Sequence, residues 1–263
     1  MGHIRVGRLP KVRGWRQVIG LLESVDSSSS DLAAATANAA KGFLAERASD
    51  PTLAYCYWLL TQITYQARTD RFSTALSEIG LEVSQTKDAL GFLGKITNVV
   101  RREVKSRGET FPFSEIVQLS LREVLTETIG QRSQSLFGTT LEDIRSACRQ
   151  YSTHQQFARL ARLYFSKVLN RTLQFFVSKE SANYLGAGGK FADLSQLSDF
   201  NLALESYCYQ SAKIVEEFAG GWYSKRNWQG EISEQDARGF VAVAFQKLRA
   251  EIAREEQGLE VEE

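Results

Sequence analysis

The sequence predicts an all-α protein of nine or ten helices, packed as one bundle or as two closely packed helical lobes. Three observations lead to this prediction. Apolar residues recur three or four positions apart along most of the chain, which is the spacing of one face of a helix. Residues that begin and end helices separate these stretches. No segment sustains the alternation of a strand, and three prolines are too few for a turn-rich β protein.

Start signals for helices occur early in the chain. Pro10 precedes the first apolar stretch, and a proline in the first turn of a helix loses no hydrogen bond. The serines at 27–30 form a linker, and Asp31 can cap the alanine-rich stretch after it. Asp50-Pro51 combines both signals and begins a stretch that is apolar on nearly all sides. We expect that helix at the centre of the bundle.

Similar signals delimit the helices in the middle of the chain. Asp70 and Ser114 each precede an apolar stretch that they can cap. Gly80 and Gly130 each follow such a stretch, and glycine readily adopts the left-handed conformation that ends many helices. If the chain forms two helical lobes, we expect the boundary near 130–139.

Two paired signals occur later in the chain. Thr140 and Asp143 have the spacing of a capping box, in which each side chain bonds the backbone N–H of the other residue. Ser233 and Asp236 have the same spacing. The glycine-rich segment 181–190 is expected to be a connecting loop. All these signals together predict helices at 12–22, 32–48, 52–68, 72–79, 85–106, 116–129, 141–179 (with a break near 152–153), 193–218 and 237–254.

The two ends of the chain carry opposite charges. The first 22 residues hold five basic residues and no acidic one, whereas 255–263 holds five glutamates and no basic residue. We therefore divide the chain into a basic N-terminal arm with the first helix and linker (1–30), a helical domain (31–254) and an acidic tail (255–263). One interpretation is that both charged ends are solvated and have no further role. The alternative is that copies of the chain associate head to tail.

Composition excludes several kinds of site. Lys and Arg number 32 and Asp and Glu 31, so the net charge of +1 provides no overall attraction to nucleic acid or to membranes. Widely spaced cysteines (56, 148 and 208) and only two histidines argue against zinc sites and most histidine-dependent catalytic centres. Isolated cysteines are typical of a reducing compartment, and no apolar run reaches the ~20 residues of a membrane span. We therefore expect a cytoplasmic protein.

The glycine-rich segment 181–190 does not fit a phosphate-binding loop. Before and after Gly189-Lys190, Tyr184 and Phe191 occupy the positions where a P-loop requires glycine and a hydroxyl residue. Phe191 also replaces the last glycine of the dinucleotide fingerprint. The sequence therefore predicts no cofactor and no metal.

The strongest local charge lies between residues 145 and 179, where no Asp or Glu occurs. Such a helical surface can bind the phosphates of RNA or DNA, an acidic protein, or the acidic tail of this chain. Alternatively, its arginines pair with glutamates of neighbouring helices. The seven basic residues are Arg145, Arg149, Arg159, Arg162, Lys167, Arg171 and Lys179.

A second candidate surface is the segment 220–230, which we expect to be a loop. It combines aromatic and basic residues between glycines, and these residue types are enriched where proteins bind partners. Alternatively, its aromatic side chains turn inward and hold the last two helices together. The candidate binding residues are Trp222, Tyr223, Lys225, Arg226 and Trp228.

Arg149 and His154 enclose four residues, and this Arg-x4-His pattern resembles the motif of the HEPN ribonucleases. That resemblance implies an all-α domain that cuts RNA without a metal, with an Arg and a His from paired subunits. Histidine can remove the proton from a ribose 2′-hydroxyl, and arginine can stabilise the charge of the transition state. Gln150 departs from the pattern, because the family prefers Asn, Asp or His after the arginine.

The sequence as a whole therefore favours a non-enzymatic helical interaction or scaffold subunit. It would present the basic stretch 145–179, and the segment 222–228, to nucleic acid or to an acidic protein, and self-association is expected. The alternative is a HEPN-like, metal-independent ribonuclease that uses Arg149 and His154. A third, weaker hypothesis is a peripheral membrane protein, which is disfavoured because the aromatic residues are needed for a core.

Overall fold

The computed structural model describes residues 13–24, 26–86, 88–107, 112–133, 140–186 and 189–261, with side chains for all of these except 179 and 255–261. Within these ranges the chain forms twelve α-helices and no strand. The prediction of an all-α protein is confirmed, and the predicted number of helices is too low. No helix in the described ranges is long and apolar enough to cross a membrane.

The helices follow one another with short connections. Those of the first half are α1 (Arg13–Glu23), α2 (Ser29–Ala39), α3 (Lys41–Arg47), α4 (Pro51–Gln66), α5 (Phe72–Glu78), α6 (Ala89–Ser106) and α7 (Phe113–Leu125). α7 continues into one π-helical turn, η1 (Thr126–Gly130). The later elements are α8 (Leu141–Gln150), α9 (His154–Ser181), the 3-10 turn η2 (Ala182–Tyr184), α10 (Leu194–Ser211), α11 (Lys213–Gln229) and α12 (Glu234–Val261).

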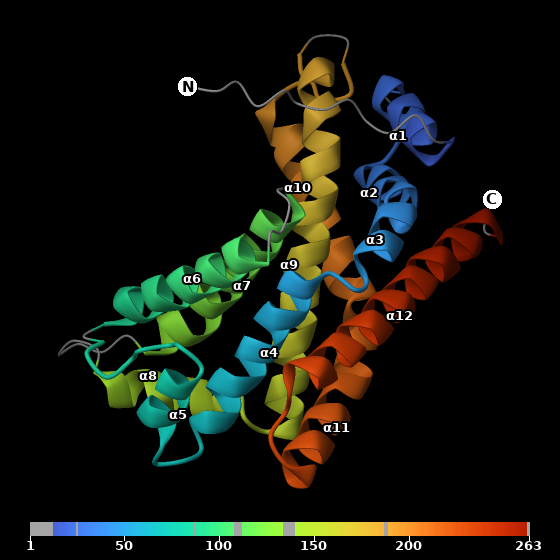
Figure 1. Ribbon diagram of the computed structural model, residues 1–263. Coiled ribbons are helices and arrows are strands. Elements are labelled where there is room, and N and C mark those ends of the chain that lie inside the picture. Colours follow the sequence, from blue (N-terminus) through green and yellow to red (C-terminus); the bar gives the residue numbers. More distant parts are fainter. Residues whose placement is uncertain are drawn as a thin grey trace.

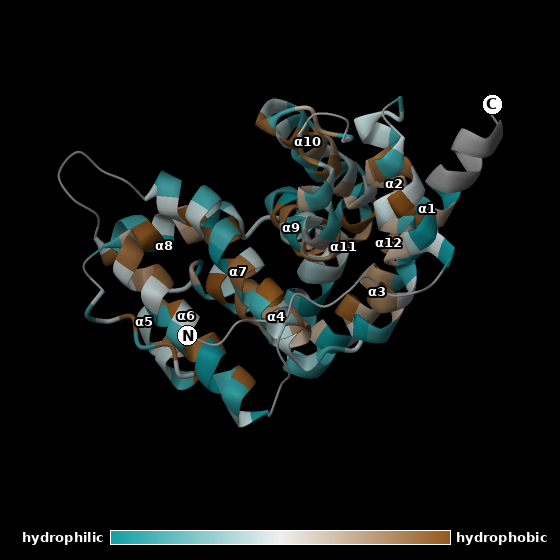
Figure 2. Ribbon diagram, turned by 90° about the horizontal axis from the view of Figure 1, so that it is seen from above, coloured by the Kyte–Doolittle hydropathy of each residue, from teal (hydrophilic) through white to brown (hydrophobic). Residues whose placement is uncertain are grey.

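The long helix α9 is the central element of the molecule (Figure 1). It packs against α7, α10 and α11. Seen from above, α5–α8 lie on one side, and α1–α3 with α10–α12 lie on the other (Figure 2). One continuous hydrophobic core extends from Trp15 to Ile252 and includes both sides. Because α9 is covered on most of its circumference, even polar residues in its middle are buried.

Several predicted helix boundaries are confirmed. Asp50 caps α4 by accepting a hydrogen bond from the Leu53 N–H at 3.0 Å, and Pro51 is the first helical residue. Gly80 follows α5 with a φ of +83°, a conformation that favours glycine. The expected break between α8 and α9 occurs at residues 151–153. Both predicted capping boxes form, at Thr140 with Asp143 and at Ser233 with Asp236.

The additional helices arise because two predicted helices are each divided. The alanine-rich stretch turns at Ala40; α2 packs on α1, α10 and α12, and α3 packs on α12. The predicted helix 193–218 is interrupted at Ala212, between α10 and α11, which both pack on α9. Each break changes the direction of the chain, so that both resulting helices pack against the core.

The expectation of an aromatic loop at 220–230 is wrong. α11 continues through both glycines as far as Gln229, and Gly230 follows it with a φ of +146°. Glycine in a helix interior costs about 1 kcal/mol relative to alanine, so the sequence alone favoured a break. The contact of α11 with α9, described below, requires a residue without a side chain at Gly220.

Three predicted caps differ in detail. Ser28 caps α2, and Asp31 is its capping-box partner rather than the cap. Asp70 does not cap α5, whose N-cap position is Arg71, and its carboxylate binds Arg145 at 3.0 Å. α7 already begins at Phe113, which makes Ser114 part of its first turn. Pro10, the arm up to residue 12, most of the predicted lobe boundary and the side chains of the acidic tail lie outside the described residues.

Candidate functional site

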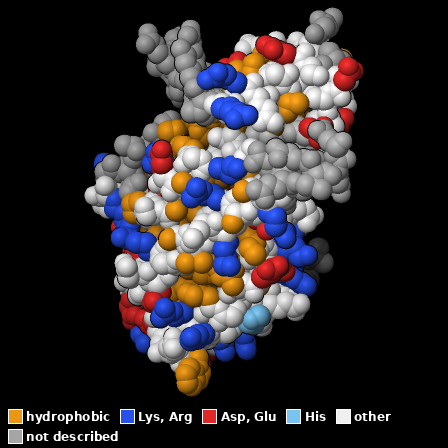
Figure 3. Space-filling view, turned by 90° about the vertical axis from the view of Figure 1, so that its right-hand side faces the viewer, with side chains coloured by type: hydrophobic (Ala, Val, Ile, Leu, Met, Phe, Trp, Pro, Cys, Tyr) orange, Lys and Arg blue, Asp and Glu red, His pale blue; other side chains and the backbone are white. Residues whose placement is uncertain are grey.

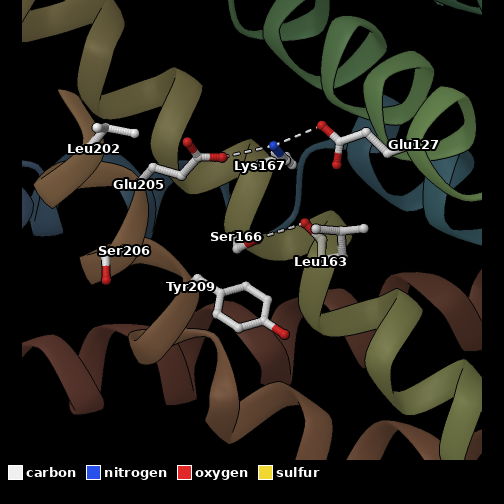
Figure 4. A pocket seen from close by; sticks show the side chains of 8 residues that line it. All are labelled: Glu127, Leu163, Ser166, Lys167, Leu202, Glu205, Ser206 and Tyr209. Atoms are coloured by element: carbon white, nitrogen blue, oxygen red, sulfur yellow. Dashed lines mark hydrogen bonds and ion pairs between the residues drawn. The ribbon is translucent and has the colours of Figure 1, made fainter. Parts of the chain in front are cut away.

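Lys167 of the basic stretch lies at the floor of a cleft between η1, α9 and α10 (Figure 4). Its ammonium nitrogen lies 2.8 Å from Glu123, 3.0 Å from Glu127 and 2.9 Å from Glu205, with Glu127 and Glu205 on opposite sides. Burial alone would lower the pKa of Lys167, but the hydrogen bonds that its ammonium donates to the three carboxylates outweigh burial and raise the pKa above its usual range. Lys167 is therefore a charged residue that the protein neutralises internally.

Arg171, one turn further along α9, belongs to the same ionic network. Its Nε and Nη2 donate to one carboxylate oxygen of Glu123 at 2.8 and 2.5 Å. Burial alone would raise the pKa of Glu123, but hydrogen bonds from Lys167 and Arg171 outweigh burial and leave the pKa lowered. The network connects α7, η1, α9 and α10.

Two further residues of the basic stretch form ion pairs with acidic residues of the same chain. Arg162 binds Glu216 at 2.9 Å and the backbone carbonyl of Tyr209 at 2.9 Å, with its guanidinium 3.8 Å from the centre of the tyrosine ring. Arg145 binds Asp70 at 3.0 Å and Glu142 at 3.3 Å. For four of the seven predicted residues, the structure thus shows the pairing with neighbouring acids that the sequence left open as the alternative.

Arg149 and Arg159 differ from these four residues. Both side chains are exposed, and neither has an ion pair within the described part of the chain. Arg149 lies in the last turn of α8 and Arg159 in the second turn of α9. The side chain of Lys179 is outside the described set. The available positive charge of the basic stretch is therefore concentrated near the start of α9.

The Arg-x4-His motif spans the junction between α8 and α9. Residues 151–153 form the turn, and Thr153 caps α9 by accepting a hydrogen bond from the Gln156 N–H at 3.3 Å. His154 is the first residue of α9, and its side chain is exposed. The two motif residues thus belong to different helices and reach solvent on either side of one short turn.

The backbone of α11 packs very closely against this turn. A Cβ atom at Gly220 would lie 2.4 Å from the His154 carbonyl oxygen and 2.9 Å from the ring atoms Nδ1 and Cε1. Three residues further along each helix, the rings of Phe157 and Tyr223 stack with their centres 3.8 Å apart. This contact joins the segments 145–179 and 218–230, neither of which contains an acidic residue.

The aromatic side chains of α11 divide into inward and outward groups. Trp222 packs 4.6 Å from Phe240 between ring centres, and Tyr223 is buried. The Tyr223 hydroxyl bonds Thr64 at 3.1 Å, and burial raises the pKa of Tyr223 to about 12. Trp228, in contrast, is 87% exposed.

The two basic residues of α11 also differ. Arg226 binds Asp236 at 3.2 Å, whereas Lys225 is exposed and has no ion pair in the described ranges. Lys225 therefore adds available positive charge near Trp228, at the same end of the molecule as the start of α9.

A cleft of about 480 Å³ opens beside these residues, between the end of α4, the turn 151–153 and the last turns of α11. It adds Arg68, an exposed residue just after α4, to the candidate site. The lining residues are Tyr65, Arg68, Thr69, Ser152, Tyr223, Ser224, Asn227 and Trp228. We call the exposed set Arg68, Arg149, His154, Arg159, Lys225 and Trp228 the basic end.

Arg68 and Tyr65 are not among the site residues predicted from the sequence, whereas Asn227 lies in the predicted surface 220–230. Arg68 appeared only as the last residue of a predicted helix, and the contact that brings it beside α11 joins distant parts of the chain. On the face that carries α12, basic side chains are scattered among hydrophobic ones, and a histidine is exposed toward its lower end (Figure 3). The basic end differs because it adjoins a cleft, which Arg68 and Trp228 line.

The chain matches no protein-family model, no curated protein and no solved structure. Among the described residues, no group of three or more His, Cys, Asp or Glu side chains is arranged to hold a metal ion. The basic end is therefore the feature of the molecule that indicates a function.

Proposed function

We propose that the protein is a non-enzymatic interaction subunit that binds single-stranded nucleic acid through its basic end. The observation that carries this proposal is the packing of two acid-free segments against each other, with Arg149, Arg159 and Lys225 exposed and without ion pairs. Unpaired basic side chains are the groups that bind phosphates, because they release the counterions of the nucleic acid without first breaking an internal pair.

An exposed aromatic ring favours nucleic acid over an acidic protein as the partner. Trp228 is 87% exposed at the edge of the cleft. Proteins that bind single strands combine basic residues along the backbone with aromatic rings on which bases stack. Bases in a duplex are already stacked on each other, so an exposed tryptophan beside a cleft favours a single strand.

The proposal predicts that charge reversal at the basic end weakens binding. In Arg159→Glu/Lys225→Glu, the affinity for a labelled single-stranded RNA should fall about tenfold, or ~1.4 kcal/mol. The negative slope of log affinity against log salt should become shallower by about 0.7 for each phosphate contact that is lost. Fluorescence anisotropy at several salt concentrations measures both quantities, and a single-stranded DNA of the same sequence tests the preference for RNA.

Lys105→Glu provides a matched control. Lys105 is an exposed residue of α6, far from the basic end in the chain and without an ion pair in the described ranges. The proposal fails if the unaltered protein shows no salt-dependent binding, or if the double variant binds as tightly as the Lys105 variant.

The same assay tests the alternative of a HEPN-like ribonuclease. Exposure of Arg149 and His154 on either side of one turn favours this second candidate. Incubation with RNA in EDTA, followed by electrophoresis, separates cleavage from binding. Cleavage that disappears in both Arg149→Ala and His154→Ala would identify an enzyme, whereas binding without cleavage supports the interaction subunit.

A further inference from the structure

The cleft of the basic end has the size and the lining of a binding site for a small group. Its volume of about 480 Å³ falls in the range of about 300–1,000 Å³ that is usual for sites of small molecules. Trp228 forms one edge with an indole ring that is 87% exposed, whereas Trp222 of the same helix is packed in the core. An aromatic ring at the mouth of this cleft presents a flat apolar surface to whatever enters.

Hydroxyl and amide groups line part of the remaining wall, beside the rings of Tyr65 and Tyr223. Ser152 donates its hydroxyl to the Arg149 carbonyl and Thr69 donates to the Gln66 carbonyl, which leaves lone pairs on both oxygens as acceptors. The amide nitrogen of Asn227 is buried beside the Tyr223 hydroxyl, toward which it acts as a hydrogen-bond donor. Nucleobase edges offer donors that the two hydroxyl oxygens can accept.

Arg68 supplies the charge at this site. Its guanidinium lies 6.0 Å from the centre of the Tyr65 ring, its side chain is exposed, and it has no ion pair among the described residues. The acidic residue closest in the chain, Asp70, is bound to Arg145 at 3.0 Å. Arg68 is therefore free to bind a phosphate.

We infer that this cleft is a single-nucleotide subsite, in which Trp228 stacks on one base of a bound strand and Arg68 binds an adjacent phosphate. This inference rests on the proposed function and adds that the strand is held by a base as well as by its backbone. A membrane anchor would need apolar area instead. Trp228 is the one large exposed hydrophobic residue at this end, and the others among the described residues lie on α6, α10, α12 or near Leu185.

The inference is tested with two probes that differ only in their bases. One is a labelled oligouridylate, and the other is a ribose-phosphate oligomer of the same length without bases. The unaltered protein should bind the oligouridylate about tenfold more tightly than the abasic oligomer, since stacking on an aromatic ring adds affinity for each base. Trp228→Ala should lose most of this preference, because its affinity for the oligouridylate falls toward that of the unaltered protein for the abasic oligomer.

Leu90→Ala is the matched control, because Leu90 is 79% exposed on α6 and lies outside the cleft. It should keep the full preference for the oligouridylate. Equal binding of both probes by the unaltered protein, or an unchanged preference in Trp228→Ala, would overturn the inference while the proposed function survives. If neither probe binds, the proposed function fails as well.

A third arm distinguishes a lipid surface. Phosphatidylserine vesicles are sedimented with the unaltered protein and with Trp228→Ala. If Trp228→Ala loses vesicle binding but keeps its affinity for the oligouridylate, Trp228 is a membrane anchor and the inference is wrong. The expected result is that Trp228→Ala changes the binding of the oligouridylate only.

Discussion

Lys167 illustrates how its surroundings determine what a single basic residue does. Its side chain is 10% exposed, and the carboxylates of Glu123, Glu127 and Glu205 surround the ammonium group within 3.0 Å. A lysine at this depth would lose much of its hydration energy without such partners. The network therefore allows a basic residue to be buried in a central helix. Because the three carboxylates neutralise its ammonium group, Lys167 is not available to bind a ligand.

We predict that Lys167→Met destabilises the protein by about 2 kcal/mol near neutral pH. The substitution preserves the packing of the side chain but leaves three carboxylates facing each other. Breaking a fully buried pair costs about 3–5 kcal/mol, and a smaller value applies here because the glutamates are partly exposed. Urea denaturation measures the difference. Arg159→Met, at an exposed residue of the same helix, should leave the free energy of unfolding nearly unchanged.

The effect of Lys167→Met should also depend on pH. The lowered pKa of Glu123 contributes stability at pH values above its unfolded pKa, and this contribution is lost as the pH falls through the folded pKa. In the variant, mutual repulsion favours protonation of the carboxylates in the folded state. The difference in unfolding free energy between the two proteins should therefore shrink as the pH falls from about 7 toward the range near 4 where glutamates titrate. A difference independent of pH would contradict this explanation.

At the scale of elements, the contact between α9 and α11 explains why a helix continues through two glycines. The backbones approach so closely at His154 that a Cβ atom at Gly220 would lie 2.4 Å from the carbonyl oxygen. A Cβ atom at the neighbouring Gly221, in contrast, would lie 3.8 Å from the nearest histidine atom, which is an ordinary contact. The two glycines are therefore not equivalent.

We predict opposite effects for alanine at these positions. Gly220→Ala should destabilise the protein by roughly 1–3 kcal/mol, because the backbone of α9 would have to move. Gly221→Ala should be neutral or stabilising by up to ~1 kcal/mol, because alanine favours a helix interior over glycine. The free energies of unfolding of the two variants test this, and a similar loss in both would mean that the close approach does not limit stability.

At the scale of the whole molecule, α4 and α9 connect the two sides seen in Figure 2. α4 contacts α5–α8 on one side and α12 on the other, and α9 contacts both α7 and α11. The hydrophobic core is continuous through these two helices. Neither side has a boundary at which it could separate without exposing the apolar surface of a shared helix.

We therefore predict that the protein unfolds in one cooperative transition. Its four tryptophans, Trp15, Trp58, Trp222 and Trp228, lie on α1, α4 and α11, outside α5–α8, whereas the circular dichroism signal reports every helix. Tryptophan fluorescence and far-UV circular dichroism should give the same midpoint in urea. A second transition seen only by circular dichroism would show that α5–α8 unfold separately.

The sequence by itself determined the helical class and the positions where several helices begin. Asp50, Thr140 and Ser233 each bond a group only three residues away, as Asp50 does with the Leu53 N–H. Such interactions depend only on residues that are close in the chain and can therefore be predicted from the sequence. The spacing of apolar residues is equally local, which is why the class and most helices could be predicted.

Only the tertiary structure decided which basic residues remain available. Besides its local partner Glu142, Arg145 binds Asp70, which lies 75 positions away in the chain. Lys167 binds Glu205, 38 positions away, and Arg171 binds Glu123, 48 positions away, and no local pattern predicts these pairs. The same holds for Gly220, whose place in a helix depends on its contact with His154. Burial and ion pairing between distant segments outweigh local propensities of about 1 kcal/mol. The basic residues of the basic end are therefore present in the sequence, and the packing of α9 against α11 brings them together at one end of the molecule.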